Sequence, residues 1–115
     1  MESEERAIMW KDNNDDILRI YTQLEKNIEF PVQCPICKKN GAHIYMHVHN
    51  FKTKRGGLWV WCSDCFSFSH SSIYVPNYWI NCPQIEVDNL CAVPKYLEEM
   101  KETIDRHVNE IMHKV

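Results

Sequence analysis

Four of the six cysteines in this chain stand as two Cys-x-x-Cys pairs, with 24 residues between Cys37 and Cys62. A Cys-x-x-Cys turn can present two thiolates to one side of a metal ion. Two such turns supply the four sulfur ligands that a tetrahedral zinc ion takes at about 2.3 Å. Four protein ligands leave no position for water or substrate, so the pattern predicts one structural Zn²⁺ rather than a catalytic one. Its predicted ligands are Cys34, Cys37, Cys62 and Cys65.

Length and composition favour one domain, residues 1–115, because 44% of these residues are hydrophobic and can form a core. No apolar run is long enough to cross a bilayer, and the N-terminus MESEERAIMW is acidic where a secretory signal would be basic and then apolar. We therefore expect a cytoplasmic protein without a membrane partner. In a reducing compartment, we interpret Cys82 and Cys91 as small buried side chains. The alternative is that they take part in extra metal ligation or redox chemistry.

Apolar residues recur at helical spacing near both ends of the chain. In the N-terminal segment, residues 1–29, Asn14 and two aspartates would cap a helix that continues to Ile28 and ends before Pro31, after a looser helical turn over residues 4–10. In the C-terminal segment, residues 94–115, Pro94 suits the first turn of a helix about 20 residues long. We interpret its apolar stripe as core, with a partner or dimer helix as the alternative.

Period-two alternation dominates the middle of the chain. It predicts a strand over residues 43–51, a turn over 52–57, a return strand over 58–62 and a third strand over 66–71. The expected fold is α+β, with a three-stranded antiparallel sheet in residues 30–72. An N-terminal helix and a long C-terminal helix would flank the sheet and cover one face of it. Residues 73–93 would form an aromatic connector.

The segments Cys34-Pro35-Ile36-Cys37 and Gly56-Gly57-Leu58-Trp59-Val60-Trp61-Cys62-Ser63-Asp64-Cys65 resemble the two knuckles of zinc-ribbon proteins. This resemblance covers about 40 of the 115 residues and implies a fold and a metal without a single function, since one fold serves many functions. As a small chain that combines a ribbon with helices, it also resembles immunity proteins of bacterial toxin–immunity pairs, including those of contact-dependent inhibition.

Histidines form a second group of chemically interesting residues. His43, His47 and His49 share one strand face, and His70 could join them from the third strand. Acid–base catalysis or a second metal site is conceivable, but histidine also serves as an amphipathic residue at a sheet margin. We favour this last role, at the sheet margin, for the four histidines. No nucleophile–base pair, phosphate loop or carboxylate pair has recognisable spacing, so we expect no enzyme activity.

Charge is distributed unevenly. Residues 1–29 carry a net charge of −4, residues 30–83 carry +4, and residues 84–115 carry −3. Cations and aromatic side chains in the middle could contact nucleic acid, whereas acidic ends could steer the chain toward a basic protein. The candidate partner-binding residues are Lys52, Lys54, Arg55, Trp59, Trp61, Tyr74, Tyr78 and Trp79.

Together these features predict a non-enzymatic zinc-ribbon binding protein with a protein partner. The favoured interpretation is a bacterial immunity protein, or antitoxin, that neutralises a basic nuclease-type toxin domain. The alternative is a small nucleic-acid-binding ribbon in transcription, translation or RNA processing, with the cations of the hairpin tip meeting phosphates while Trp59 and Trp61 stack on bases. The sequence leaves the oligomeric state open.

Overall fold

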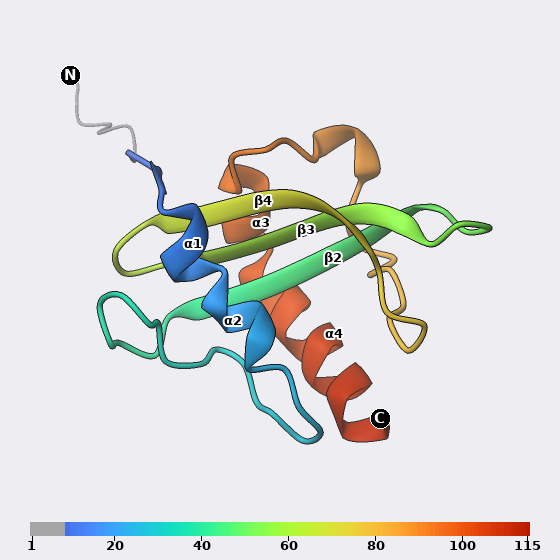
Figure 1. Cartoon of the computed structure of the whole chain (residues 1–115), viewed down its shortest axis with the longest axis horizontal. Helices are drawn as coiled ribbons and strands as arrows, with labels where there is room; N and C mark the ends of the chain where they lie inside the picture. The colour runs from blue at the N-terminus through green and yellow to red at the C-terminus, as the bar shows by residue number, and fades with distance from the viewer. Residues whose placement is uncertain (1–8) are drawn as a thin grey trace.

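The centre of the fold is a mixed four-stranded β-sheet (Figure 1). The computed structural model describes residues 9–115. Its strands lie in the order β1-β4-β3-β2, and their bounds are β1 (Lys11–Asp12), β2 (Ala42–Asn50), β3 (Arg55–Cys62) and β4 (Ser67–Tyr74). Strands β2, β3 and β4 are antiparallel neighbours, and β1 runs parallel to β4. The α+β prediction is confirmed, whereas the prediction of only three antiparallel strands is wrong.

Strand β1 is an element that the sequence did not indicate. The backbone N–H of Lys11 donates to the carbonyl of Phe66 at 2.8 Å, and that of Asn13 donates to the carbonyl of Phe68 at 3.2 Å. These bonds place the short segment on the edge of β4. A strand of two residues has no alternation to detect, so only tertiary pairing defines it.

The N-terminal helical segment is shorter than its apolar pattern predicts. It forms two helices, α1 (Asn14–Ile17) and α2 (Arg19–Thr22), and the chain then leaves helical geometry. Asn27 takes a left-handed φ of 67°, and its N–H donates to the carbonyl of Met112 instead of to a helical neighbour. The predicted turn over residues 4–10 falls mostly outside the described residues, and Met9 and Trp10 are not helical.

The C-terminal segment also forms two helices, α3 (Lys95–Glu99) and α4 (Lys101–Lys114), where one was predicted. Met100 lies between them with φ −102° and ψ 13°, outside helical geometry. Pro94 immediately precedes α3, close to its predicted place. In the connector, β4 extends to Tyr74, and a loop with one short 3₁₀ helix, η1 (Val87–Asn89), leads to α3.

The helices cover opposite faces of the sheet, contrary to the prediction that both cover one face. Ser69 of β4 is hydrogen-bonded to Asn14 of α1, and its cross-strand partner is Val60. His43 of β2 is hydrogen-bonded to Asp105 of α4, and its partner is Trp61. Neighbouring residues such as 60 and 61 point to opposite faces of a strand. Accordingly, α1 and α2 lie in front of the sheet in Figure 1, and α4 lies behind it.

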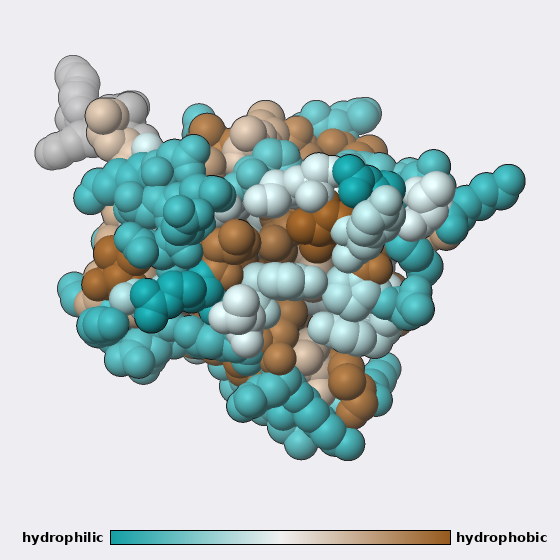
Figure 2. Space-filling view, viewed as in Figure 1, coloured by the Kyte–Doolittle hydropathy of each residue, from teal (hydrophilic) through white to brown (hydrophobic). Residues whose placement is uncertain are grey.

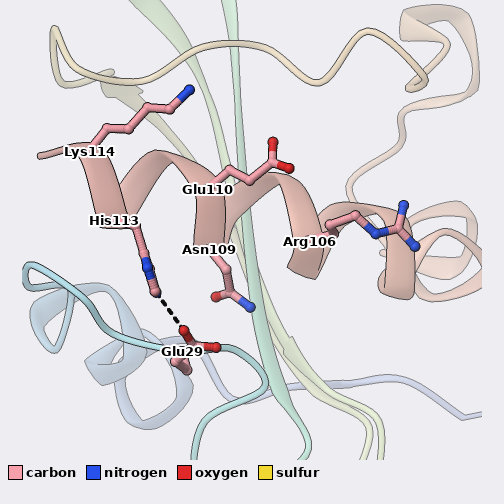
Figure 3. Close-up of a pocket in the computed structure, with 6 residues that line it drawn as sticks. All are labelled: Glu29, Arg106, Asn109, Glu110, His113 and Lys114. Carbon is pink, nitrogen blue, oxygen red and sulfur yellow. Dashed lines mark hydrogen bonds and ion pairs between the residues drawn. The ribbon is translucent and has the colours of Figure 1, made fainter.

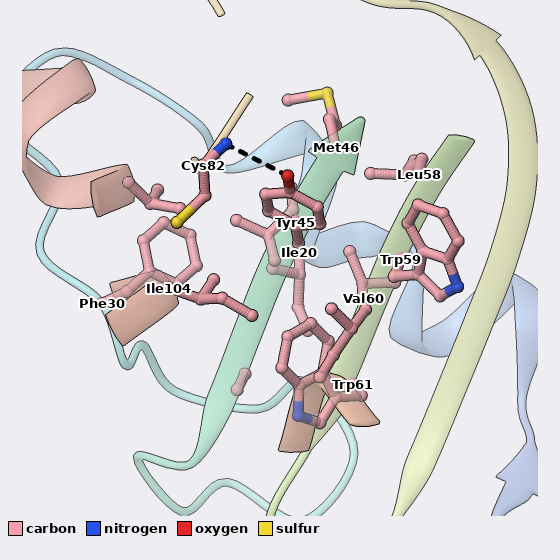
Figure 4. Packing of buried hydrophobic residues seen from close by; sticks show 14 of the residues in the cluster. Ile20, Phe30, Tyr45, Met46, Leu58, Trp59, Val60, Trp61, Cys82 and Ile104 are labelled. Atoms are coloured by element: carbon pink, nitrogen blue, oxygen red, sulfur yellow. Dashed lines mark hydrogen bonds between the residues drawn. The ribbon is translucent and has the colours of Figure 1, made fainter. Parts of the chain in front are cut away.

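This arrangement buries both faces of β2 and β3 in one hydrophobic cluster (Figure 4). The face toward α1 and α2 carries aliphatic side chains, Ile44, Met46, Leu58 and Val60. The opposite face carries the large rings of Tyr45, Trp59 and Trp61. The only exposed residues of these two strands are His49, Asn50 and Arg55, at the end where the hairpin turns.

Candidate metal centre and hairpin tip

Both Cys-x-x-Cys segments fold into the same tight turn. The N–H of Lys38 donates to the carbonyl of Cys34, and the N–H of Phe66 donates to the carbonyl of Cys62, each at 3.0 Å. Lys38 and Phe66 follow the second cysteine of their pair and take left-handed φ values of 69° and 59°. In each turn a backbone N–H also points at the first sulfur at 3.3 Å, from Ile36 to Cys34 and from Asp64 to Cys62.

The two turns bring all four predicted ligands together. The four Sγ atoms lie within 4.8 Å of one another. The Cys34–Cys65 distance is 3.8 Å and the Cys37–Cys62 distance is 3.7 Å. A tetrahedron with metal–sulfur bonds of about 2.3 Å has edges of about 3.8 Å. The sulfurs are therefore spaced for one tetrahedral ion.

The environment of the thiols differs from one cysteine to the next. Burial raises the pKa of Cys34 and of Cys62. Burial also acts to raise the pKa of Cys65, but hydrogen bonds from the Ser67 side chain and backbone outweigh it and lower that pKa to about 7. Asn13 Nδ2 donates to Ser67 Oγ at 2.6 Å and so fixes the hydroxyl beside Cys65. Such outer partners orient metal ligands.

A hydrogen-bonded chain connects the second turn to the C-terminal helices. His43 lies between Asp105 and Ser63, with Nδ1 2.8 Å from Asp105 Oδ1 and Nε2 2.8 Å from Ser63 Oγ. Ser63 in turn donates to Glu98 Oε1 at 2.7 Å. Glu98 also accepts from Trp61 Nε1 at 3.0 Å and pairs with Lys101 at 2.9 Å. Sequence reasoning missed this chain, because its members lie far apart in the sequence.

The spacing of Ser63, His43 and Asp105 is that of a nucleophile–base pair with an orienting carboxylate, but Ser63 also contacts a second carboxylate. A carboxylate only accepts, so Glu98 Oε1, 2.7 Å from Ser63 Oγ, competes with His43 Nε2 for the single serine proton. Asp105 likewise accepts from the other ring nitrogen. A serine nucleophile instead gives its proton to the histidine. The geometry is that of a clamp between the second turn and the two C-terminal helices.

Three of the predicted partner-binding residues lie in the core. Trp61 is fully buried, and Trp59 and Trp79 are nearly so. The indole N–H of Trp59 donates to the carbonyl of Cys91, and that of Trp79 donates to the carbonyl of Met46, both at 2.7 Å. These rings are therefore not available for stacking on a base. The alternation of Trp59 and Trp61 with Leu58 and Val60 fits a strand buried on both faces as well as a half-exposed one.

Four of the other predicted residues lie at the exposed tip of the β2–β3 hairpin, which projects at the right of Figure 1. Lys52 and Arg55 are exposed, Lys54 is half-buried, and Tyr74 lies opposite Arg55 in the sheet with an exposed fraction of 69%. Tyr78, 38% exposed, lies in the following loop beside the C-terminal end of α4 and is not part of the tip. Sequence reasoning missed Phe51, which is also 69% exposed. The signal for it was its position as the last aromatic residue before the basic turn.

The backbone of the tip is held by several hydrogen bonds. Asn50 Oδ1 accepts from the N–H groups of Lys52 and Thr53 at 2.9 and 3.1 Å. The N–H of Val75 donates to the carbonyl of Lys54 at 2.8 Å, which ties the end of β4 to the turn. The side chains of this turn are thus presented on an ordered backbone.

The histidines do not form a second metal cluster. Among residues 9–115, the four cysteines are the one group of three or more potential ligands with metal-compatible spacing. His47 is hydrogen-bonded to the Tyr45 hydroxyl at 2.8 Å, and burial, followed by the charge of His49, lowers its pKa. His70 stacks on Trp59 with ring centroids 4.5 Å apart. Cys82 is buried as predicted, but Cys91 is exposed, since it lies in the loop after η1.

A hollow of about 540 Å³ lies beside α4 (Figure 3). Three of the side chains that line it, Glu29, Asn109 and His113, already have partners. His113 is paired with Glu29, and the Asn109 amide is hydrogen-bonded to both the N–H and the carbonyl of Phe30. These contacts hold the loop before the first Cys-x-x-Cys turn against α4, and the hollow brings no group of reactive side chains together.

Comparison with protein-family models, with curated proteins and with solved structures finds no match. In residues 9–115, none of the helices combines the length and the apolar character that a bilayer-spanning segment needs.

Proposed function

We propose that Cys34, Cys37, Cys62 and Cys65 hold one structural Zn²⁺, as in the zinc ribbons that the sequence resembles. Four sulfur ligands at tetrahedral spacing suit zinc or an iron–sulfur centre, and a closed four-ligand site is the arrangement of structural zinc. The ion would join the two turns at the base of the hairpin, and the chain would act by binding rather than by catalysis.

For the binding function, we propose contact with nucleic acid through the hairpin tip. The observation that carries this proposal is the composition of the tip, where Lys52, Lys54 and Arg55 lie beside the exposed rings of Phe51 and Tyr74. Residues 30–85 contain a single acidic residue, Asp64, and it belongs to the metal centre at the opposite end of the hairpin. Cations meet phosphates, and aromatic rings stack on bases.

A protein partner is the second candidate, and a different surface favours it. Asp12, Asp15 and Asp16 are exposed together at the start of α1, where Figure 2 shows a hydrophilic area. Such a surface would steer the chain toward a basic protein, as an immunity protein acting on a nuclease toxin in the cytoplasm requires.

Metal analysis and titration with nucleic acid test these proposals separately. We expect about one zinc per chain, and binding to RNA or DNA that weakens as salt rises. An iron-containing, coloured protein would overturn the choice of metal. Absence of binding at about 50 mM salt would overturn the nucleic-acid proposal. Rescue of cells from a toxin encoded by a neighbouring gene, abolished by Asp15→Lys with Asp16→Lys, would establish the protein partner instead.

A further inference from the structure

Two exposed aromatic side chains, Phe51 and Tyr74, lie at the hairpin end of the sheet. Phe51 follows Asn50, and Asn50 pairs with Arg55, which pairs in turn with Tyr74 on β4. Both rings are 69% exposed. Exposed aromatic rings at the end of a hairpin contribute nothing to the hydrophobic core, and the buried rings of this protein lie elsewhere on the sheet.

Arg55 is held beside Tyr74. Its guanidinium carbon lies 4.6 Å from the centre of the Tyr74 ring, and Nη2 donates to Ser72 Oγ at 3.2 Å. The guanidinium therefore covers one face of the tyrosine, whose side chain is still largely exposed. Its remaining N–H groups can contact a phosphate beside a stacked base. A cation that is already held in place loses little side-chain entropy on binding.

The small number of cations at the tip favours a single-stranded ligand over a duplex. A duplex carries the higher charge density, and its base faces are covered by stacking, so a site that used charge alone would prefer it. Three cations give limited electrostatic affinity. Two open rings add affinity only for bases whose faces are free, as in a single strand.

We propose that the hairpin tip binds single-stranded RNA or DNA by stacking unpaired bases on Phe51 and Tyr74, while Lys52, Lys54 and Arg55 contact the adjacent phosphates. This inference rests on the proposed nucleic-acid function and specifies its ligand. The site tolerates different base sequences, because every base has a face that can stack.

The test is a titration of the zinc-loaded full chain, followed by fluorescence anisotropy, with three labelled probes of equal length. The probes are an oligouridylate, a duplex, and an abasic strand that keeps the phosphates but has no bases. We expect the oligouridylate to bind more tightly than either of the others. Phe51→Ala and Tyr74→Ala should each weaken oligouridylate binding by about 5- to 150-fold and leave abasic-strand binding unchanged.

Met9→Ala is the matched control, because Met9 is 77% exposed beside β1 at the other end of the sheet. It should leave binding of all three probes unchanged. Zinc content and circular dichroism should be the same in all variants, since both ring substitutions are on the surface. Duplex or abasic binding as tight as oligouridylate binding would overturn the stacking inference and leave nucleic-acid binding standing. Failure to bind any probe would overturn both.

Discussion

The two ends of the β2–β3 hairpin differ, although the same two strands form both of them. At the base, Ala42 pairs with Cys62, and the strand side chains are buried beside the four sulfurs or the His43 hydrogen-bonded chain. At the tip, Asn50 pairs with Arg55, and the side chains face solvent. The ordered tip backbone shows that an exposed end need not be a loose one. Stability and recognition should therefore respond to different substitutions.

The largest expected effect is loss of the metal ligands at the base. Cys62→Ser should abolish zinc binding and unfold both turns, because zinc binding supplies about 10–16 kcal/mol in zinc-finger peptides, as much as the whole stability of a typical domain. Metal analysis and NMR spectra measure this. The matched control is Cys91→Ser, an exposed cysteine that should retain the metal and the fold. A metal-free Cys62→Ser protein with a native spectrum would contradict the assignment.

The next effect concerns the clamp between the base and α4. Asp105→Asn removes the carboxylate that accepts from His43 in a buried site, where breaking such a pair costs about 3–5 kcal/mol. Urea unfolding of the zinc-loaded protein measures the loss. Glu102→Gln changes an exposed carboxylate on the same helix and should stay within about 0.5 kcal/mol of the parent. Equal stabilities of the two variants would show that the clamp contributes little.

A pair of glycines compares the two ends directly. A Cβ atom on Gly56, near the tip, would lie 2.1 Å from the carbonyl oxygen of His47, which is fixed backbone. A Cβ on Gly41, near the metal centre, would lie 2.1 Å from Asp64 Oδ2, the end of a side chain that can rotate away. Gly56→Ala should therefore cost about 1–3 kcal/mol.

Gly41→Ala should cost clearly less in the same thermal or urea unfolding experiment. The reverse order would mean that the base of the hairpin, and not the strand near its tip, tolerates an added Cβ atom less well.

The smallest effect on stability is expected at the tip itself. Lys52→Glu changes an exposed side chain and should alter the free energy of unfolding by no more than about 0.5 kcal/mol. It should nevertheless weaken binding to a single strand and lower the salt slope by about 0.7, the value for one phosphate contact. Lys39→Glu, an exposed lysine near the metal centre, should leave the slope unchanged.

The sequence predicted the parts of the molecule that obey local rules. The spacing of the cysteines identified the metal-compatible cluster, and period-two alternation located β2, β3 and β4 within a few residues. The sequence did not predict those parts of the fold that depend on contacts between distant segments. Leu24 and Ile28 have helical spacing and pack against the core, but α2 ends at Thr22, and Asn27 donates to Met112 of α4 instead of to a helical neighbour.

The same limit applies to the candidate sites. Trp59 and Trp61 alternate with Leu58 and Val60 as they would in a half-exposed strand, and only helices on both faces bury all four. The clamp needed Asp105, 62 residues from His43, and no local pattern announces such a pair. Phe51 was visible as an aromatic residue next to the turn, but its exposure followed from the end of strand pairing at Asn50.

The position of Trp61 gives the protein an internal optical reporter. Its indole stacks on His43 with ring centroids 5.2 Å apart, donates to Glu98, and belongs to the residue next to Cys62. Because Trp61 is the neighbour of Cys62 in the chain, a change at the sulfurs alters the surroundings of a buried fluorophore directly. Removal of metal should shift tryptophan emission to longer wavelength, so metal release and rebinding can be timed in solution without any label.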